Sequence, residues 1–393
     1  MREAGYPETS LPHRPTLLTV DLDAVVENAR LLSARTQDRP LLAVVKANAY
    51  GMGALPVARA LIQAGLAPWL GVALVEEGVH LRRHGISVPI LLLGPAGPEQ
   101  VPAILEHGIT PALYSIGFLK ALQAEAQRRG VRAEAHLKAD SGMGRLGFRP
   151  EELPALLAAL ASSPNVVITG LFSNLASADD PEAPQNRWQL DRFLQILDRL
   201  RTAGMNPRWV HLANSSAIHA HPATHLSLCR PGLSLYGMRA SPALPDIRLR
   251  PAVTFHTVLA QVKRMPAGAP VGYGATYLCR EGQRIGILPV GYADGLPRCL
   301  QGEGYVLANG ARCPIVGRVS MDLTAVDLDP AGDLSEGAEI TLWGQEGAES
   351  LGPWDWARWA KTIPYEIMTG IGCRVARRYR FRGQAWTEEP LPA

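Results

Sequence analysis

The sequence has few cysteines and no long apolar run, and each shortage excludes a class of protein. Its five cysteines contain no C-x-x-C pair, so neither a disulfide framework nor a zinc ribbon is indicated. No stretch approaches the roughly 18 unbroken apolar residues that a membrane-spanning helix needs, and residues 1–15 lack the apolar run of a secretory signal. These absences predict a soluble protein of the reducing cytoplasm.

Lysine is also scarce, and the charges nearly balance. The formal net charge is +3 over 393 residues, and no dense basic run is present, so neither nucleic acid nor an anionic membrane is expected as a partner. A small molecule is the more natural ligand. If a lysine forms a Schiff base, the candidates are only Lys46, Lys120, Lys138, Lys263 and Lys361.

Short apolar runs alternate with helical patterns over the first part of the chain. Eight such runs, separated by turn residues and amphipathic segments such as 152–161 and 188–203, are typical of parallel βαβ units. At this count and length they predict an α/β fold, a (β/α)₈ barrel of the TIM type. The predicted strands are 41–46, 70–74, 90–93, 111–114, 133–138, 166–172, 209–212 and 226–229.

Beyond about residue 246 the pattern changes to short Val-, Ile- and Thr-rich runs broken by Gly and Pro, which indicates a mainly β domain. We therefore predict a barrel over residues 21–245, a C-terminal β domain over 246–393, and an N-terminal segment, 1–20, that packs with the β domain. The predicted strands of the β domain are 253–262, 284–289, 305–307, 325–328 and 339–342, with one short helix at 354–360.

Polar residues follow several predicted barrel strands, where active sites of such barrels lie. They are Lys46, Lys138, Asn174, His211 with Asn214 and Ser215, and Arg230 followed by Gly232. Ser215 and Gly232 stand where a phosphate-binding loop is common. Lys46 follows an apolar strand, and partial desolvation there would favour its neutral, nucleophilic amine. By position alone, a lysine that merely reaches the solvent at the rim is the more common case.

Two other patterns do not support a binding site. Residues 142–147 match G-x-G-x-x-G, but no acidic residue closes the following strand, so we interpret these glycines as shaping a loop that directs Arg145 inward. His219, His221, His225 and Cys229 fit no standard zinc spacing. No metal site is predicted.

Eight segments, in order between about residues 16 and 380, resemble the motifs of the alanine racemase family. They are residues 43–51, 136–147, 211–215, 230–237, 272–277, 291–295, 317–322 and 362–366. The resemblance implies a pyridoxal 5'-phosphate enzyme, a barrel followed by a β domain, and a head-to-tail homodimer in which each active site is completed by the partner's β domain.

The resemblance also implies the catalytic roles. Lys46 would carry the cofactor as a Schiff base and act as the base on one side of the substrate α-carbon. Tyr273 of the partner subunit would be the base on the opposite side, helped by a hydrogen bond from His211, because a phenol with an ordinary pKa of about 10 is a poor base at neutral pH. Arg230 would sit at the pyridine nitrogen and keep it unprotonated.

The remaining site residues follow from the same resemblance. Lys138 matches a position that is often carbamylated and then orients Arg145. The cofactor phosphate would be held by Tyr50, Ser215, Gly232, Leu233 and Tyr365, with Asn174 and Asn214 also at the cofactor. The substrate carboxylate would be bound by Arg145 and Met321, and Tyr292 would line the entrance.

Two residues depart from the usual family pattern. Met52 and Asn174 both stand where histidine is common, and Asn174 lies where that histidine stacks on the cofactor ring. A broader amino acid racemase, acting for example on serine, therefore stays open. A pyridoxal-phosphate decarboxylase and a non-catalytic cofactor carrier are more distant alternatives. The family implies supply of D-alanine for a bacterial cell wall.

Overall fold

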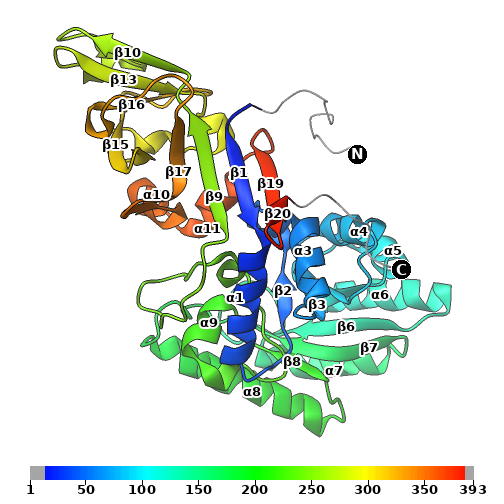
Figure 1. The fold of residues 1–393 in the computed structure, drawn as a ribbon. Coiled ribbons are helices and arrows are strands. Elements are labelled where there is room, and N and C mark those ends of the chain that lie inside the picture. Colours follow the sequence, from blue (N-terminus) through cyan, green and yellow to red (C-terminus); the bar gives the residue numbers. More distant parts are fainter. Residues whose placement is uncertain (1–13, 386–393) are drawn as a thin grey trace. The chain divides into compact units, whose positions relative to one another are not determined.

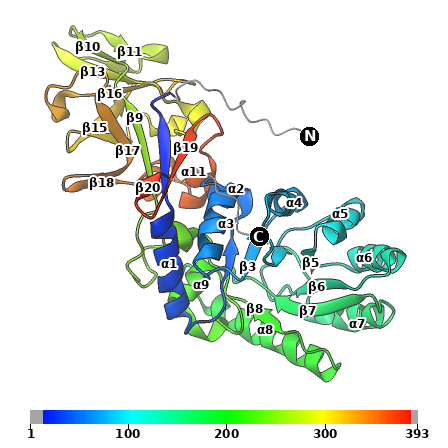
Figure 2. The same cartoon turned by 45° about the vertical axis from the view of Figure 1, so that its right-hand side comes forward.

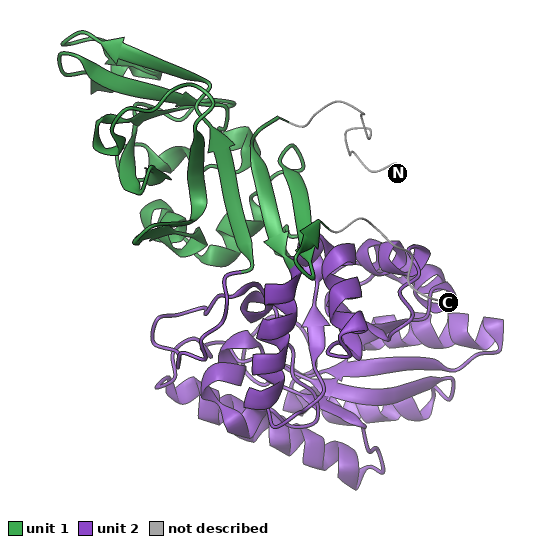
Figure 3. Cartoon of the chain, viewed as in Figure 1, with its two compact units in different colours: residues 1–21, 50–52, 252–387 green, residues 22–49, 53–251, 388–393 purple. Residues whose placement is uncertain are grey.

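The computed structural model describes residues 14–385, which divide into two compact units (Figure 3). Of the described residues, unit 1 contains 14–21, Tyr50–Met52 and 252–385. Unit 2 contains Leu22–Ala49 and Gly53–Pro251. Among the described residues, no helix has the length and apolar character needed to cross a bilayer.

Within the described residues, unit 2 is built on a seven-stranded parallel sheet whose strands follow one another in sequence order, as in a TIM-type barrel (Figures 1 and 2). Each strand pairs with the next one along the chain, and most of their residues are buried, as parallel strands covered by helices require. The strands are β2 (Leu42–Val44), β3 (Trp69–Val72), β4 (Ile90–Leu92), β5 (Ile109–Leu113), β6 (Ala133–Lys138), β7 (Val166–Phe172) and β8 (Trp209–His211).

The prediction of an eighth regular strand at 226–229 is wrong. That segment instead forms single parallel bridges, one from Cys229 to Leu41 and one from Arg230 to Asn214. It therefore joins the segments that flank β2 and β8. A longer ladder is prevented because Leu226 lies at φ 46° and Pro231 has no N–H to donate.

One irregularity interrupts the pairing of β6 with β7. Ala135 pairs with Ile168, but the next residue, His136, pairs with Gly170, so Thr169 is an extra residue in β7. A β-bulge of this kind re-aims the side chains that follow it. It lies in the half of β7 that leads to the candidate site.

The amphipathic patterns at 152–161 and 188–203 are confirmed as the helices α7 and α8. Each of these two helices buries apolar side chains on one face. In α8, Phe193, Ile196, Leu197 and Leu200 are buried at the three- and four-residue intervals of a single face. The helices are α1 (Leu22–Arg35), α3 (Ala54–Gln63), α4 (Val75–Arg83), α5 (Val101–Glu106), α6 (Ile116–Arg129), α7 (Leu153–Ala161), α8 (Pro184–Thr202) and α9 (Ser215–Ala220), with the short turn α2 (Lys46–Tyr50) and the 3₁₀ helices η1 (Pro98–Gln100), η2 (Pro150–Glu152), η3 (Pro222–Thr224) and η4 (Leu233–Tyr236).

Unit 1 is mainly β, as predicted. Over the described residues its large sheet runs in the order β10-β13-β16-β15-β14-β17-β9-β1-β19-β20, with β18 beside β17 (Figure 1). Its strands are β1 (Leu17–Asp21), β9 (Val253–Val258), β10 (Gln261–Met265), β13 (Gln283–Leu288), β14 (Tyr305–Ala308), β15 (Ala311–Val316), β16 (Thr324–Asp327), β17 (Glu339–Glu346), β18 (Glu349–Leu351), β19 (Ala376–Phe381) and β20 (Gln384–Ala385).

Several elements of unit 1 differ from the sequence-based expectation. The single strand predicted at 253–262 is two strands, β9 and β10, and β1 lies between β9 and β19. The helix predicted at 354–360 is confirmed as α10 (Pro353–Ala360). Elements that the sequence did not reveal include β1, β15, β18, β19 and β20, the small pair β11 (Pro270–Val271) and β12 (Tyr277–Leu278), the helix α11 (Pro364–Thr369), and the 3₁₀ helices η5 (Tyr273–Ala275), η6 (Tyr292–Asp294), η7 (Arg298–Leu300) and η8 (Asp329–Ala331).

Candidate active site

The polar residues expected at the strand ends do gather at one end of the unit 2 sheet. Lys138 and His211 are the last residues of β6 and β8, and Asn174 follows β7 by two residues. Lys46 follows β2 by two residues, and Arg230 lies in the bridged segment beside Asn214. Because the strands are parallel, all five residues lie at the carboxyl-terminal edge of the sheet.

Lys46 is half-buried at this edge. Burial lowers the pKa of its amine below the ordinary value of 10.5, and the positive charge of Arg145 lowers it further, while Glu77 acts in the opposite direction. A lowered pKa increases the fraction of neutral amine, which is the nucleophilic form. Arg145 itself is exposed in the single chain.

Arg230 is buried at the centre of the site and holds its charge among uncharged partners. Its guanidinium donates to the carbonyl oxygens of Ser173 at 2.7 Å and Leu212 at 3.1 Å, to the Asn174 side-chain oxygen, and to Nδ1 of His211 at 3.0 Å. Burial lowers the pKa of Arg230 to about 10, so the group stays protonated at neutral pH.

The contact between Arg230 and His211 fixes the direction of a hydrogen-bond chain. A guanidinium can only donate, so Nδ1 of His211 must accept, and the proton of a neutral His211 is then on Nε2. Nε2 lies 3.0 Å from Nδ1 of His136 and donates to it. His136 therefore carries its own proton on Nε2, a buried atom with no hydrogen-bond partner within residues 14–385.

The surroundings of His136 explain how the hydrogen-bonded series of Arg230, His211 and His136 fits inside the sheet. Its ring lies 5.1 Å from that of Trp69, and an added Cβ at Gly170 would come within 2.4 Å of the imidazole. Gly170 follows the bulge in β7, so the bulge and the missing side chain together make the space. His136 lies two residues before Lys138 on β6, so both side chains are on the same face of the strand, and this spacing is the sequence signal for His136.

The expected hydrogen bond from His211 to Tyr273 does not fit this geometry. His211 is completely buried, and both of its ring nitrogens are engaged, one by Arg230 and the other by His136. Neither nitrogen is left for a phenol. Asn174 is the half-buried polar side chain that lies beside Arg230 at the rim.

Lys138 is buried without a hydrogen-bonded carboxylate among the described residues. Its Nζ lies 4.3 Å from the centre of the Phe172 ring. Burial, followed by the charges of Arg230 and Arg145, lowers the pKa of Lys138 well below 10.5. The neighbouring Asp140 is engaged elsewhere, because one of its oxygens accepts the N–H groups of residues 142, 143 and 144. Those N–H groups are therefore not directed at a phosphate, which agrees with rejection of a dinucleotide site.

Ser215 and Gly232 lie together, as a phosphate-binding loop requires. The Ser215 hydroxyl accepts the N–H of Gly232 at 2.8 Å and that of Ser234 at 3.3 Å, which leaves its own proton to donate. Asn214 caps α9 by accepting the N–H of Ala217 at 3.0 Å. Leu233 follows in η4 and is buried.

The other predicted site residues belong to unit 1. The rings of Tyr50 and Tyr365 lie 6.0 Å apart, and burial, then Tyr365, raises the pKa of Tyr50. In contrast, three large side chains are open to solvent in the single chain: Tyr273 is 72% exposed, Met321 is 52% exposed and Tyr292 is 43% exposed. Apolar exposure of this extent is typical of a surface that a partner covers.

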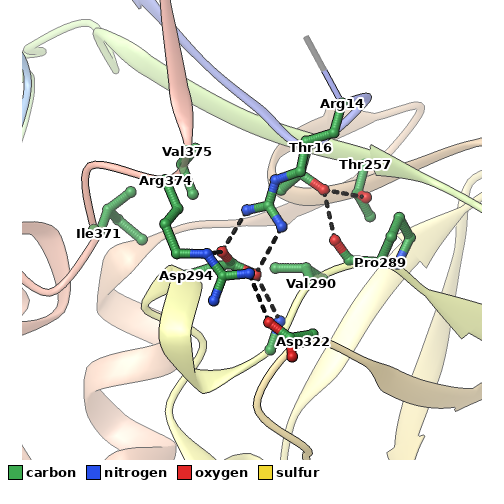
Figure 4. Close-up of polar contacts among 12 residues, drawn as sticks. Arg14, Thr16, Thr257, Pro289, Val290, Asp294, Asp322, Ile371, Arg374 and Val375 are labelled. Carbon is green, nitrogen blue, oxygen red and sulfur yellow. Dashed lines mark hydrogen bonds and ion pairs between the residues drawn. The ribbon is translucent and has the colours of Figure 1, made fainter. Parts of the chain in front are cut away.

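The loops that carry Tyr292 and Met321 are supported by a buried carboxylate, that of Asp294. Figure 4 shows Asp294 with Arg14 and Arg374, the two arginines beside it. Asp294 is fully buried and accepts from the guanidinium of Arg14 and from the N–H of Gly291, while Arg374 lies 3.7 Å away and pairs with Asp322. The N–H groups of Tyr292 and Ala293 donate to the carbonyls of residues 320 and 321 at 3.0 Å each. No local sequence pattern marks Arg14 or Asp294 as the support of this loop pair.

A sheet of sequential parallel strands with a half-buried lysine, a buried arginine and a serine-glycine loop at one edge defines a pyridoxal-phosphate class of barrel enzyme, here joined to a β unit. The chain belongs to the alanine racemase family. The family model described as alanine racemase, N-terminal domain, matches residues 20–240, and that described as alanine racemase, C-terminal domain, matches residues 252–379.

Curated relatives and solved structures agree with this assignment. The alanine racemase of Symbiobacterium thermophilum is 45% identical over 93% of this chain and 97% of its own length. The alanine racemase of Desulforamulus reducens is 40% identical over 93% of this chain and 99% of its own length. The crystal structure of alanine racemase from Streptomyces lavendulae has a TM-score of 0.89 at 40% identity, covering 95% of this chain and 98% of its own. The crystal structure of alanine racemase from Bacillus anthracis with bound L-Ala-P has a TM-score of 0.89 at 35% identity, covering 96% of this chain and 97% of its own.

The hydrogen-bond chain predicts the protonation of both histidines. Burial, then Arg230, lowers the pKa of His136 to about 3 and that of His211 well below 6.5. Nitrogen-15 NMR should therefore find both rings neutral, with the proton on Nε2, at a pH of about 6.5, where an ordinary histidine is half protonated. Since the unfolded chain binds these protons near pH 6.5, the free energy of unfolding should fall as the pH is lowered from about 6.5 toward 3. Titration of either ring near pH 6.5 in the folded protein would contradict the arrangement.

The Asp294 network predicts a large loss of stability from a single amide substitution. Asp294→Asn leaves the two guanidinium groups without their buried carboxylate and should lower the free energy of unfolding by about 3 kcal/mol. Arg312→Gln is the matched control, because its pair with Glu349 is partly exposed and is worth about 1 kcal/mol or less. Denaturant unfolding measures both, and equal effects of the two substitutions would be inconsistent with the network.

Proposed function

We propose that this chain interconverts L-alanine and D-alanine with pyridoxal 5'-phosphate, using Lys46 and Tyr273 of the partner subunit as the two bases. The observation that carries the proposal is the half-buried Lys46 amine, whose pKa is lowered, at the strand-end edge of a chain that belongs to the alanine racemase family. The racemases named above support alanine as the substrate.

The residues present fit the cofactor, which the family uses. The cofactor has three groups that need partners, and unit 2 offers one for each: the Lys46 amine, whose pKa is lowered, for the aldehyde, the Arg230 guanidinium for the ring nitrogen, and the proton of the Ser215 hydroxyl, which lies beside Gly232, for the phosphate. When bound, the cofactor supplies a conjugated ring that stabilises negative charge at the substrate α-carbon.

Arg230 limits how strongly that ring withdraws electrons. Its partners are backbone carbonyls, an amide oxygen and an unprotonated imidazole nitrogen, none of which can take its proton at neutral pH. A guanidinium that keeps its proton also keeps the ring nitrogen unprotonated. We infer that Arg230 in this way disfavours side reactions such as transamination.

Lys46 and Tyr273 divide the proton transfer between two sides of the substrate. The neutral Lys46 amine removes or returns the α-proton on one side, and Tyr273 of the partner subunit does so on the other. The exposure of Tyr273, Met321 and Tyr292 in the single chain supports a homodimer in which a partner covers them. Met321 and Arg145 would bind the substrate carboxylate, and Tyr292 would line the entrance.

Asn174 takes over the assistance that the sequence analysis assigned to His211. The Asn174 side-chain oxygen accepts from Arg230, so its amide N–H groups are left to donate toward the rim. Donation to the Tyr273 phenol would stabilise the phenolate, which is the form that can accept a proton. An amide at position 174, where histidine is common in the family, is thus compatible with racemisation.

Lys138 has the properties of a carbamylated lysine. The neutral amine is the form that reacts with carbon dioxide, and burial, with the charges of Arg230 and Arg145, favours that form of Lys138. The amine nitrogen would bond to the carbon of carbon dioxide and lose a proton to solvent, and the charges of Arg230 and Arg145 would stabilise the resulting carbamate anion. It would also orient Arg145. We further propose a cytoplasmic enzyme that supplies D-alanine for cell-wall synthesis.

The cofactor assignment predicts where a reductive trap will react. Borohydride treatment of the enzyme loaded with pyridoxal 5'-phosphate should fix a pyridoxyl group on Lys46, identified by peptide mass spectrometry. The extent of labelling of the reconstituted protein should rise with pH to a plateau reached below the ordinary lysine pKa of 10.5, because neutral amine increases as the pH passes the lowered pKa. Lys263→Ala, on β10, is the control and should label normally. Capture on another lysine would refute the assignment.

A shared active site predicts complementation between two inactive variants. Lys46→Ala and Tyr273→Phe proteins should each lose racemase activity, measured as formation of D-alanine from L-alanine. After subunit exchange, half of the dimers are hybrids with one intact site of two, so activity should return to about a quarter of the wild-type value. No recovery in samples with proven exchange would exclude a partner-supplied Tyr273.

A further inference from the structure

Lys46 is followed by a backbone turn of the hand that L-residues disfavour. Four consecutive residues have positive φ: 51° at Ala47, 52° at Asn48, 53° at Ala49 and 57° at Tyr50. None of them is glycine, and α2 is therefore one turn of left-handed helix. Single residues adopt this conformation routinely only when they are Gly, Asn or Asp, and each other residue raises the free energy of the turn. Contacts from elsewhere must hold it.

The contact that stands out is the carboxylate of Glu77, in the first turn of α4. Oε1 accepts the N–H of Ala47 at 2.6 Å, and Oε2 accepts the N–H groups of Ala73 at 2.7 Å and Leu74 at 3.1 Å. One side chain thus ties the turn after β2 to the loop after β3. Charge-assisted bonds of this kind are about twice as strong as neutral ones.

Two neutral contacts complete the turn. The Asn48 side-chain oxygen accepts the N–H of Ala54 at 2.8 Å, and the N–H of Ala49 donates to the carbonyl of Val45 at 2.8 Å. They fix the middle and the end of the turn. The N–H nearest to Lys46, that of Ala47, is held by Glu77.

Helix capping accounts for only part of this arrangement. Glu77 is at the third position of α4, where an acidic residue commonly accepts backbone N–H groups at the start of its own helix. The bonds of Oε2 to Ala73 and Leu74 are of this type. The bond of Oε1 to Ala47 lies 30 residues away in sequence and contributes nothing to the start of α4.

The bond to Ala47 acts on the peptide group that joins Lys46 to Ala47. Holding that peptide plane fixes ψ of Lys46, and with it the direction in which the Lys46 side chain leaves the end of the strand. We propose that Glu77 is a positioning residue for Lys46: its carboxylate holds the left-handed turn and so directs the lysine amine. This role rests on the proposed function of Lys46, whereas the hold on the turn does not.

The test compares Glu77→Gln with Glu76→Gln. Glu76 is the preceding residue of α4, is exposed, and has Gln100 as its side-chain partner, so the control removes the same charge from the same helix start. A glutamine at 77 has one acceptor oxygen and cannot serve both Ala47 and the Ala73–Leu74 pair. Glu77→Asp keeps the negative charge but shortens the side chain, so it separates the contribution of the charge from that of the hydrogen bond to Ala47.

Two measurements are made on the full chain. Hydrogen exchange at the Ala47 amide, in protein free of cofactor, should accelerate roughly tenfold in Glu77→Gln and Glu77→Asp, the loss of one charge-assisted bond. The rate of pyridoxal 5'-phosphate attachment to Lys46, followed by absorbance and borohydride trapping, should fall by about the same factor. Glu76→Gln should stay within about twofold of wild type in both.

The outcomes separate the positioning role from its alternatives. Faster exchange at Ala73 and Leu74 with unchanged exchange at Ala47 would mean that Glu77 only caps α4, and the proposal would be overturned. Changed exchange at Ala47 with normal attachment would overturn the effect on Lys46. Failure of the wild-type protein to attach the cofactor at Lys46 would instead refute the proposed function, and the exchange data would still report on the turn.

Discussion

The charge of Arg230, buried among uncharged partners, is the feature around which the interior of unit 2 is organised. Within residues 14–385 its hydrogen bonds go to two carbonyls, an amide oxygen and an imidazole nitrogen. A buried cation makes every further positive charge nearby unfavourable. The depressed pKa values of His136, His211 and Lys138 all follow from burial and this charge. Burial and this charge therefore favour the neutral forms of all three side chains.

The site also depends on backbone geometry that costs free energy locally. A left-handed turn of non-glycine residues follows Lys46, and a bulge interrupts β7 just before the residues that contact Arg230. Strained or irregular backbone of this kind persists only where surrounding contacts determine it. The turn after Lys46 is held by the carboxylate of Glu77 from α4. The bulge in β7 is matched by the packing of the His136 ring against Gly170. Both irregularities occur at the strand-end edge, where the polar residues gather.

Sequence patterns predicted the repeated strands and helices of unit 2 because hydrophobic period and turn residues report local structure directly. They wrongly predicted a regular strand at 226–229, because an apolar run does not report the left-handed conformation of Leu226 or the pairing that Pro231 prevents. They missed β19, whose sequence Ala-Arg-Arg-Tyr-Arg-Phe lacks apolar alternation although the strand pairs with β1.

The candidate site was predicted less evenly. Strand-end positions identified Lys46, Lys138, His211 and Arg230, because their placement follows from the order of the strands. The partners of those residues could not be read in the same way. The bond between Glu77 and Ala47 and that between Arg14 and Asp294 join residues far apart in the chain, and no local pattern records them.

The extra residue in β7 decides which atoms face the mouth of the barrel. Side chains alternate along a strand, so the insertion of Thr169 shifts every later residue of β7 by one place relative to β6. Without it, the positions of Ser173 and Asn174 would exchange faces, and the amide beside Arg230 would be replaced by a neighbour from the other side. The polarity of this rim is thus encoded by parity, the odd or even count of residues in one strand, as much as by the identity of the residues themselves.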